Sequence, residues 1–316
     1  MTLSAPFKIG SVEIKNRLIL APMAGYTDVA MRTLCARSGA GLTVTEMVSA
    51  KGLCFSPDKS APLLFTDESE SVKCVQLFGS EPEYFEKALL SPLLDKFDII
   101  DINMGCPVPK IVKNGEGSAL LNDLVLAKEI VSACVSASKN RPITVKTRLG
   151  FKSGEDRSIE FCSALASVGA KAITLHGRTK EQGYSGYADW EAIKRLSQAL
   201  SIPVIGSGDI SDENASERSN YATALMIGRF AVGDSQVFAR ILGEYLGANK
   251  ADLLLEHYDL MQRFYGEHYA HVNIRHHIGG YLKGMRGQKE IKLALFSAPT
   301  PTETRKILLS IREKRL

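Results

Sequence analysis

Long apolar runs and a secretory start are absent from this 316-residue sequence. No stretch approaches the ~20 consecutive apolar residues that a membrane-spanning helix needs. The first residues also lack the charged-then-apolar pattern of a signal peptide. We therefore expect a cytoplasmic protein that does not enter a membrane. With 45% hydrophobic and 23% charged residues, the composition favours an ordinary globular chain over a disordered one.

Cysteine is sparse and never paired in sequence. The six cysteines stand singly at positions 35, 54, 74, 106, 134 and 162. The absence of C-x-x-C pairs argues against the usual zinc sites, and the low density argues against a disulfide scaffold, so we expect reduced thiols and no metal. A G-x-G-x-x-G fingerprint is also missing, which leaves no separate dinucleotide-binding domain and no basis for choosing between NADPH and NADH.

The positive charge is concentrated in the C-terminal fifth of the chain. The whole chain carries a net charge of +4, but residues 250–316 hold 12 Lys and Arg against 7 Asp and Glu. The preceding part is close to neutral. A basic segment beside a neutral domain suggests a polyanionic partner, although a solvated helical surface explains the charge equally well.

Short β-branched or apolar runs, each followed by a turn and a helical pattern, recur through the first 230 residues. The expected strands are Leu18–Ala21, Leu42–Met47, Lys73–Leu77, Ile99–Asn103, Ile143–Thr147, Ala172–His176, Val204–Ser207 and Ala224–Ile227. Strands that alternate with helices run parallel, and eight such units predict a closed (β/α)8 TIM barrel, with an open doubly wound sheet as the alternative. Residues 7–14 read as a hairpin around Gly10 and Ser11 that could plug the bottom of the barrel.

After Arg229 only helical patterns remain. They cover Gln236–Leu246, Ala251–Tyr265, Ile274–Gly284 and Glu303–Lys314. We therefore expect a barrel domain over residues 1–245 and a small all-helical domain over residues 246–316.

Polar residues gather at the ends of the expected strands, where a barrel carries its chemistry. Cys106 lies in a Gly-Cys-Pro turn outside the apolar run that would bury it, so we interpret it as catalytic, whereas most single cysteines are inert core residues. Lys146 interrupts an apolar strand, which implies a negatively charged ligand. His176 and Gln76 occupy similar positions, but each could equally be a satisfied polar residue.

The last two strands end in Ser207-Gly208-Asp209 and Gly228-Arg229. Barrels commonly hold a phosphate at these two loops, through backbone N–H groups and a cation. The loop that follows His176 contains Arg178, Lys180 and Tyr184, a mixture suited to phosphate contact and base stacking, although a solvated loop is the simpler interpretation.

At these residues the sequence resembles the tRNA-dihydrouridine synthase family, and the tail around His277-Ile278-Gly279 with Tyr281-Leu282 resembles the bacterial branch called DusB. The matching strings are Ala21-Pro22-Met23-Ala24-Gly25-Tyr26-Thr27-Asp28, Thr45-Glu46-Met47, Asn103-Met104-Gly105-Cys106-Pro107, Lys146-Thr147-Arg148, His176-Gly177-Arg178-Thr179, Gln182-Gly183-Tyr184, Gly208-Asp209 and Ile227-Gly228-Arg229. The combination of N-x-G-C-P, Lys-x-Arg and His-Gly-Arg-Thr is highly specific. One position departs from the family, which usually has Asn where this chain has Ser207.

The resemblance implies an FMN-bearing barrel that reduces D-loop uridines of tRNA with NADPH. It implies that the flavin ring is lined by Pro22, Met23, Ala24, Gln76, Lys146 and His176, and that Ser207, Gly208, Asp209, Gly228 and Arg229 lie at its ribityl phosphate. Asn103 and Arg148 would lie near the uracil, with Arg178 and Lys180 as further substrate contacts. Position 17 is the leading expectation for the modified uridine, and we expect a monomer.

The implied reaction adds a hydride to C6 of uracil from FMN and a proton to C5 from Cys106. Two alternatives stay open. One is a flavin-dependent reductase of a free pyrimidine, similar to dihydroorotate dehydrogenase. The other is a non-enzymatic RNA-binding protein on a barrel scaffold, which would bind no flavin.

Overall fold

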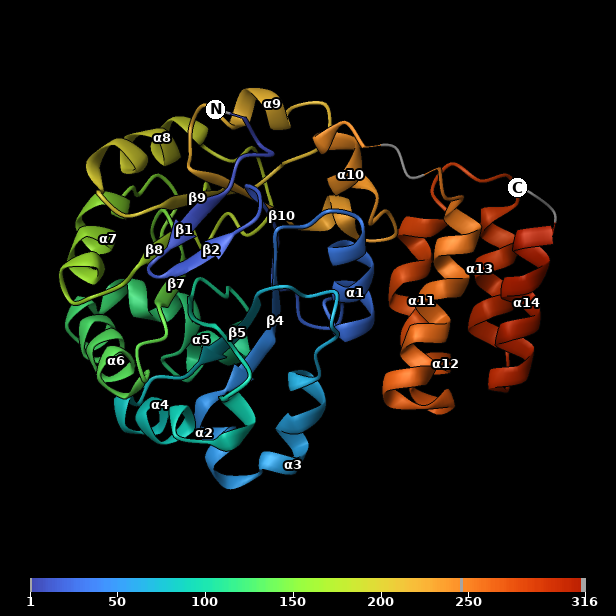
Figure 1. Ribbon diagram of the computed structural model, residues 1–316, viewed down its shortest axis with the longest axis horizontal. Coiled ribbons are helices and arrows are strands. Elements are labelled where there is room, and N and C mark those ends of the chain that lie inside the picture. The colour runs from blue at the N-terminus through green and yellow to red at the C-terminus, as the bar shows by residue number, and fades with distance from the viewer. Residues whose placement is uncertain (1, 245–246, 314–316) are drawn as a thin grey trace.

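The computed structural model describes residues 2–244 and 247–313, and its main body is a closed parallel barrel (Figure 1). Eight strands follow one another in the order β10-β3-β4-β5-β6-β7-β8-β9. Their bounds are β3 Leu18–Leu20, β4 Leu42–Ser49, β5 Lys73–Phe78, β6 Ile99–Met104, β7 Ile143–Arg148, β8 Ala172–His176, β9 Val204–Ser207 and β10 Ala224–Ile227. The closed order confirms the predicted TIM barrel and excludes the open sheet, and the strand positions agree with the prediction to within two residues.

A helix on the outside of the barrel follows each strand, because the strand residues are apolar on both faces and need cover on both. The helices of the barrel are α1 Val29–Arg37, α2 Ala50–Phe55, α3 Pro57–Ser60, α4 Pro82–Leu89, α5 Pro109–Lys113, α6 Leu124–Ala137, α7 Ser158–Ser167, α8 Trp190–Ala199, α9 Ala215–Arg218 and α10 Val237–Leu242. Short 3-10 helices cover Ala61–Leu64, Pro92–Leu94, Gly117–Asn122 and Arg229–Ala231. Aspartates cap several first turns; Asp189, for example, accepts the amide N–H of Ala192.

The predicted hairpin is present as β1 Phe7–Ile9 and β2 Val12–Ile14, paired antiparallel. Gly10 occupies the turn with φ +58°, a conformation that favours glycine. Phe7, Ile9 and Ile14 share a buried cluster with residues at the beginnings of the barrel strands, such as Leu42 and Ile99. The hairpin therefore plugs the N-terminal end of the barrel, as predicted, and leaves the opposite end open.

Four further helices form a bundle beside the barrel (Figure 1). They are α11 Lys250–Tyr265, α12 Glu267–Tyr281, α13 Gln288–Ser297 and α14 Pro301–Glu313. Their buried side chains form a second apolar cluster, and Ala30 and Leu34 of α1 belong to it. The bundle is therefore attached to the barrel through α1. None of the helices formed by the described residues combines the length and apolar character that crossing a bilayer requires.

The prediction of the C-terminal helices was wrong in three places. The expected helix at Ile274–Gly284 begins earlier, at Glu267, and ends at Tyr281. Helix α13 was missed, because its residues are mostly charged or exposed and only Leu295 is buried, so its apolar stripe is faint. The predicted helix Gln236–Leu246 ends at Leu242, where Gly243 takes the left-handed conformation. Residues 245–246, which include the predicted domain boundary, and residue 314 lie outside the described residues.

Candidate functional site

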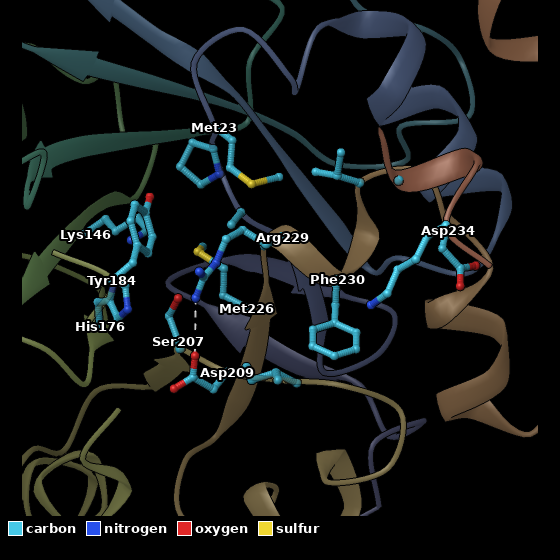
Figure 2. Close-up of a pocket in the computed structure, with 18 of the residues that line it drawn as sticks. Met23, Lys146, His176, Tyr184, Ser207, Asp209, Met226, Arg229, Phe230 and Asp234 are labelled. Carbon is cyan, nitrogen blue, oxygen red and sulfur yellow. Dashed lines mark hydrogen bonds and ion pairs between the residues drawn. The ribbon is translucent and has the colours of Figure 1, made fainter. Parts of the chain in front are cut away.

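A cavity of about 750 Å³ opens at the C-terminal ends of the barrel strands. Figure 2 shows residues that line it, with Lys146, His176 and Tyr184 on one side and Phe230 and Asp234 on the other. The predicted site residues that line it are Pro22, Met23, Lys146, His176, Ser207, Gly208, Asp209, Gly228 and Arg229. Residues from five different strand ends thus share one cavity, whose size is that of a cofactor site.

The loop after β9 has an unusual backbone. Gly208 has φ +120° and Asp209 has φ +53°. A Cβ atom at Gly208 would lie 2.6 Å from Cβ of Ala188, so only glycine fits. The Asp209 carboxylate accepts hydrogen bonds from Arg178 Nη2 at 2.6 Å and from the amide of Ala188 at 2.9 Å. Burial raises the pKa of Asp209, but these hydrogen bonds outweigh it, so the net pKa is lowered and the group is an anion at neutral pH.

Arg229 is the exposed cation of this end of the cavity. Its side chain is 57% exposed, its Nη2 lies 3.3 Å from Asp209 Oδ1, and its guanidinium lies 4.5 Å from the ring centroid of Tyr184. Figure 2 shows Arg229 extending through the middle of the cavity toward Asp209. Ser207 is adjacent, and its hydroxyl forms no hydrogen bond with any of the described residues. Arg229 and Ser207 can therefore both serve an anionic ligand.

Burial lowers the pKa of both Lys146 and His176, but the two side chains differ in charge at neutral pH. Burial and the neighbouring charge of Arg148 lower the pKa of Lys146 to about 8. Within the part of the chain that the structure describes, its ammonium forms no ion pair. Burial and the charges of Lys146, Arg148, Arg178 and Arg229 hold the pKa of His176 well below its usual value. At neutral pH the cavity therefore contains a largely charged lysine beside a neutral imidazole.

Cys106 lies on the turn after β6 and is only partly buried. Its backbone N–H donates to Asn103 Oδ1 at 2.9 Å. Gly117 packs against the Cys106 side chain so closely that a Cβ atom added at Gly117 would lie 3.0 Å from Cys106 Cβ. Burial raises the pKa of Cys106, and the charges of Arg148 and Lys146 only partly oppose this. The side chain is therefore a protonated thiol at neutral pH, in the electrostatic range of both cations. Cys74, Cys134 and Cys162 are buried, as expected of most single cysteines.

Gln76 and Asn103 lie beneath this turn rather than in the cavity wall. Asn103 Nδ2 donates to Gln76 Oε1 at 2.9 Å, and Gln76 Nε2 donates to Asp101 Oδ2 at 2.7 Å. Asn103 Oδ1 accepts the amides of Gly105 and Cys106. Asn103, expected near the uracil, uses its oxygen and amino group within the protein.

The four other expected residues lie around the cavity without lining it. Arg148 is buried and donates to the carbonyls of Gly105, Thr179 and Gly183. Arg178 is also buried, and its guanidinium forms an ion pair with the Asp209 carboxylate. The Lys180 ammonium lies 4.6 Å from the ring centroid of Phe151, and Ala24 is exposed at the rim. The two arginines therefore fix loops around the mouth.

Sequence reasoning missed several residues of the cavity wall. Tyr184 was noticed in its loop but not assigned to the site, although it lines the cavity close to Arg229. Met226, Phe230, Asp234, Lys250 and Lys283 also line the cavity. Only the positive charge of the tail pointed to the two lysines. No group of three or more His, Cys, Asp or Glu suited to a metal ion occurs among the described residues.

Comparison with known protein families finds one match over almost the whole chain. The family model described as Dihydrouridine synthase (Dus) matches residues 19–315. The tRNA-dihydrouridine synthase B of Vibrio parahaemolyticus is 37% identical over 94% of this chain and 96% of its own length. The protein of the same name from Pseudomonas aeruginosa is 37% identical over 90% of this chain and 89% of its own.

Solved structures with the same fold are much more distant in sequence. A structure of morphinone reductase in complex with tetrahydroNAD superposes with a TM-score of 0.57 at 13% identity, covering 80% of this chain and 94% of that one. Histamine dehydrogenase from Rhizobium sp. 4-9 gives a TM-score of 0.60 at 18% identity, covering 82% of this chain and 51% of that one. At such identities the likeness concerns the barrel fold alone.

Proposed function

The chain belongs to the dihydrouridine synthase family, and we propose that it reduces the C5=C6 bond of D-loop uridines in tRNA, with FMN as cofactor and NADPH as reductant. The observation that carries this proposal is the arrangement of the barrel mouth. An anion-binding end formed by the β9 and β10 loops shares one cavity with Lys146, and the protonated thiol of Cys106 is in the electrostatic range of that lysine.

The residues of the cavity fit a flavin mononucleotide. Gly208 leaves no room for a side chain, Arg229 offers an exposed guanidinium, and the Ser207 hydroxyl is not engaged by the described residues. These groups, with Gly228, would hold the phosphate. Pro22, Met23, Lys146 and His176 would line the ring. A bound, reduced flavin supplies the hydride for C6 of the uracil.

Cys106 would supply the proton. A general acid must hold its proton at the working pH and sit within reach of the reacting atom. Burial raises the pKa of Cys106, so the thiol keeps its proton at neutral pH. The hydrogen bonds of its turn to Asn103 fix the backbone from which Sγ projects. A thiol held in this way would donate its proton to C5 of the uracil.

Lys146 and the neutral His176 would polarise the site without taking part in the proton transfer. A lysine with a pKa of about 8 is mostly charged at neutral pH and stabilises negative charge that develops beside it. A neutral imidazole can donate one hydrogen bond and accept another, to the flavin or the base.

We propose that residues 246–316 form the tRNA-binding domain, joined to the barrel domain of residues 1–245. Lys250 and Lys283 extend the cavity wall from the helical bundle, so an RNA that enters the cavity passes basic side chains of both parts. A D-loop uridine stacked in folded tRNA has to be flipped out, which costs a few kcal/mol, and phosphate contacts would offset this cost. We expect the protein to act as a cytoplasmic monomer.

The direct test is to incubate the purified protein, FMN and NADPH with an unmodified tRNA transcript and to map dihydrouridine along it. Dihydrouridine at a D-loop position, with position 17 expected, supports the proposal. Turnover of free orotate or uracil instead would favour the free-pyrimidine reductase. A colourless protein that binds tRNA without reducing it would favour the RNA-binding scaffold.

A further inference from the structure

A buried acid inside the barrel has no part in the reaction proposed above. Asp101 of β6 is only 3% exposed, and its side chain lies one layer below the barrel mouth. One carboxylate oxygen accepts from Gln76 Nε2 at 2.7 Å and the other accepts from Thr144 Oγ1 at 2.6 Å. An ionisable group in such a strand is costly unless it is used. Its partners connect it to the turn of Cys106.

The carboxylate sets the direction of a chain of two side-chain amides. Burial raises the pKa of Asp101, while the hydrogen bonds from Gln76 and Thr144 and the charge of Lys146 favour its ionised form. The ionised carboxylate can only accept, so Gln76 then turns its Nε2 toward Asp101 and its Oε1 away from it. Gln76 Oε1 can only accept in turn, so Asn103 has to offer it Nδ2, which leaves Asn103 Oδ1 facing the loop. Without Asp101, Gln76 Nε2 would lose its acceptor, and only the loop N–H groups of Gly105 and Cys106 would hold the Asn103 amide in this orientation.

Asn103, at the other end of this chain of amides, contacts the turn that contains Cys106. Asn103 Oδ1 accepts the backbone N–H groups of Gly105 at 3.2 Å and of Cys106 at 2.9 Å. If the Asn103 amide were reversed, its NH₂ group would face two other donors, and the turn could not keep its shape. The second N–H of Asn103 Nδ2 points to Met47 Sδ at 3.8 Å. Asn103 is therefore committed to the turn.

We propose that Asp101 is a positioning residue for Cys106, because its carboxylate orients the Gln76 and Asn103 amides so that Asn103 Oδ1 holds the Gly105-Cys106 turn. The inference rests on the proposed function for the chemical role of the thiol. It assigns Asn103 Oδ1 to the support of the Gly105-Cys106 turn.

The test moves the carboxylate from position 101 to position 103, the two ends of the hydrogen-bonded row of side chains. In Asn103→Asp, the new carboxylate still accepts the two loop amides, but Gln76 now lies between two acceptors and can donate to only one of them. In the double variant Asp101→Asn/Asn103→Asp, Gln76 reverses: it donates to the carboxylate at position 103 and accepts from the new amide at position 101. The oxygen of that new amide still accepts from Thr144, so every hydrogen bond of the chain is restored, with the amides running in the opposite direction.

The readout is single-turnover dihydrouridine formation by the flavin-loaded full-length protein. We expect Asn103→Asp to lower the rate about 100-fold, because a misplaced acid costs roughly that much, and the double variant to recover at least about tenfold of the loss. Both variants carry the same carboxylate at position 103, so its charge beside Cys106 cancels in the comparison. Rescue by a second substitution is not expected of residues that merely fill space.

Two single variants keep the test informative if the double variant loses its flavin or unfolds. Asp101→Asn no longer forces Gln76 to donate toward position 101 and should slow the reaction about tenfold, because only the two loop N–H groups then hold the Asn103 amide in its orientation. Thr144→Val removes the other partner of Asp101 and leaves the amide chain intact, so it should change the rate less than about threefold. Equal rates for these two variants would refute the inference.

A double variant no faster than Asn103→Asp, with both loaded and folded, would also overturn it, as would an Asn103→Asp variant as fast as the wild type. Alkylation of Cys106 by iodoacetamide separates this inference from the proposed function. If the wild type forms no dihydrouridine, the proposed function fails. The positioning of the thiol is still tested, because Asn103→Asp should shift the alkylation rate and the double variant should return it.

Discussion

The two halves of the barrel mouth use their polar groups in opposite ways. Around Cys106, the amides of Gln76 and Asn103 are held in a fixed chain of hydrogen bonds within the protein. Around the β9 and β10 loops, the Ser207 hydroxyl is not engaged by the described residues and the Arg229 side chain is 57% exposed. The half around Cys106 fixes its own side chains by internal hydrogen bonds, whereas the half formed by the β9 and β10 loops has polar groups that are accessible to a ligand.

This difference matches the task that we propose for each half. A proton donor is useful only in one position, and internal hydrogen bonds supply that precision before the substrate arrives. A cofactor phosphate brings its own charge and oxygens, so its site needs accessible donors more than a completed network. The two halves should therefore respond differently to substitution, the first through the rate of the chemical step and the second through flavin affinity.

The largest effect is expected from Cys106→Ala. Loss of a general acid typically costs 10²- to 10⁴-fold in rate, so dihydrouridine formation should fall at least about 100-fold while FMN binding and its reduction by NADPH continue. Cys54→Ala is the matched control, since Cys54 is also a partly buried cysteine but lies on α2, where its thiol contacts the carbonyl of Tyr84. The two variants are compared by single-turnover assay on one tRNA transcript. Undiminished product from Cys106→Ala would remove the thiol from the mechanism.

Arg229→Ala should act on affinity. A charge-assisted hydrogen bond contributes about 1.5–3 kcal/mol, and the exposure of Arg229 places it toward the lower end, so we expect FMN to bind about tenfold more weakly. Fluorescence titration of the apoprotein with FMN measures this. Arg195→Ala is the control, because Arg195 is a similarly exposed arginine, paired with Asp156 on the outside of the barrel. A slower single turnover at saturating FMN would contradict a purely binding role.

Lys146 adds a pH dependence to the same titration. Its pKa is lowered to about 8, so it is charged below that pH and loses its charge as the pH rises through it. Because an anionic ligand binds the charged form better, FMN affinity should fall severalfold between about pH 7 and pH 9. Lys146→Met should bind more weakly at pH 7 and lack this part of the pH dependence. A Lys146→Met variant with the same pH profile as the wild type would show that another group titrates.

The smallest effect is expected at Ser207, where the family usually has Asn. A neutral hydrogen bond contributes about 0.5–1.5 kcal/mol, so Ser207→Ala should weaken FMN binding by about two- to tenfold. Ser207→Asn tests whether the larger side chain of the relatives is tolerated here. If Ser207→Ala binds FMN as tightly as the wild type, the hydroxyl does not contact the cofactor.

The barrel could be predicted from the sequence because its signals are local. Each strand is a short apolar run bounded by turns, and a lysine at position 146 is conspicuous inside such a run. By the same reasoning Asp101, inside Ile99–Met104, could have been singled out, since an acid in a buried strand is equally unusual. The sequence signal is therefore the same at both positions: a charged residue inside a buried apolar strand.

The hydrogen-bond chain could not have been predicted in this way. It connects side chains on β5 and β6 to a turn, and its direction follows from which atom of each amide faces which neighbour. The burial of Arg178 could not be predicted either. A basic residue in a loop is expected to be exposed, and only the structure places it against Asp209. Helix α13 was missed for a related reason: its few buried contacts come from other helices of the bundle.

The most direct test of the division between the two halves is to measure FMN affinity and single-turnover dihydrouridine formation at saturating FMN on Cys106→Ala and Arg229→Ala side by side. We expect a crossed result: Cys106→Ala keeps its affinity and loses the chemical step, whereas Arg229→Ala loses affinity and keeps the step. If both variants lose the same property, the two halves of the mouth do not have separate tasks.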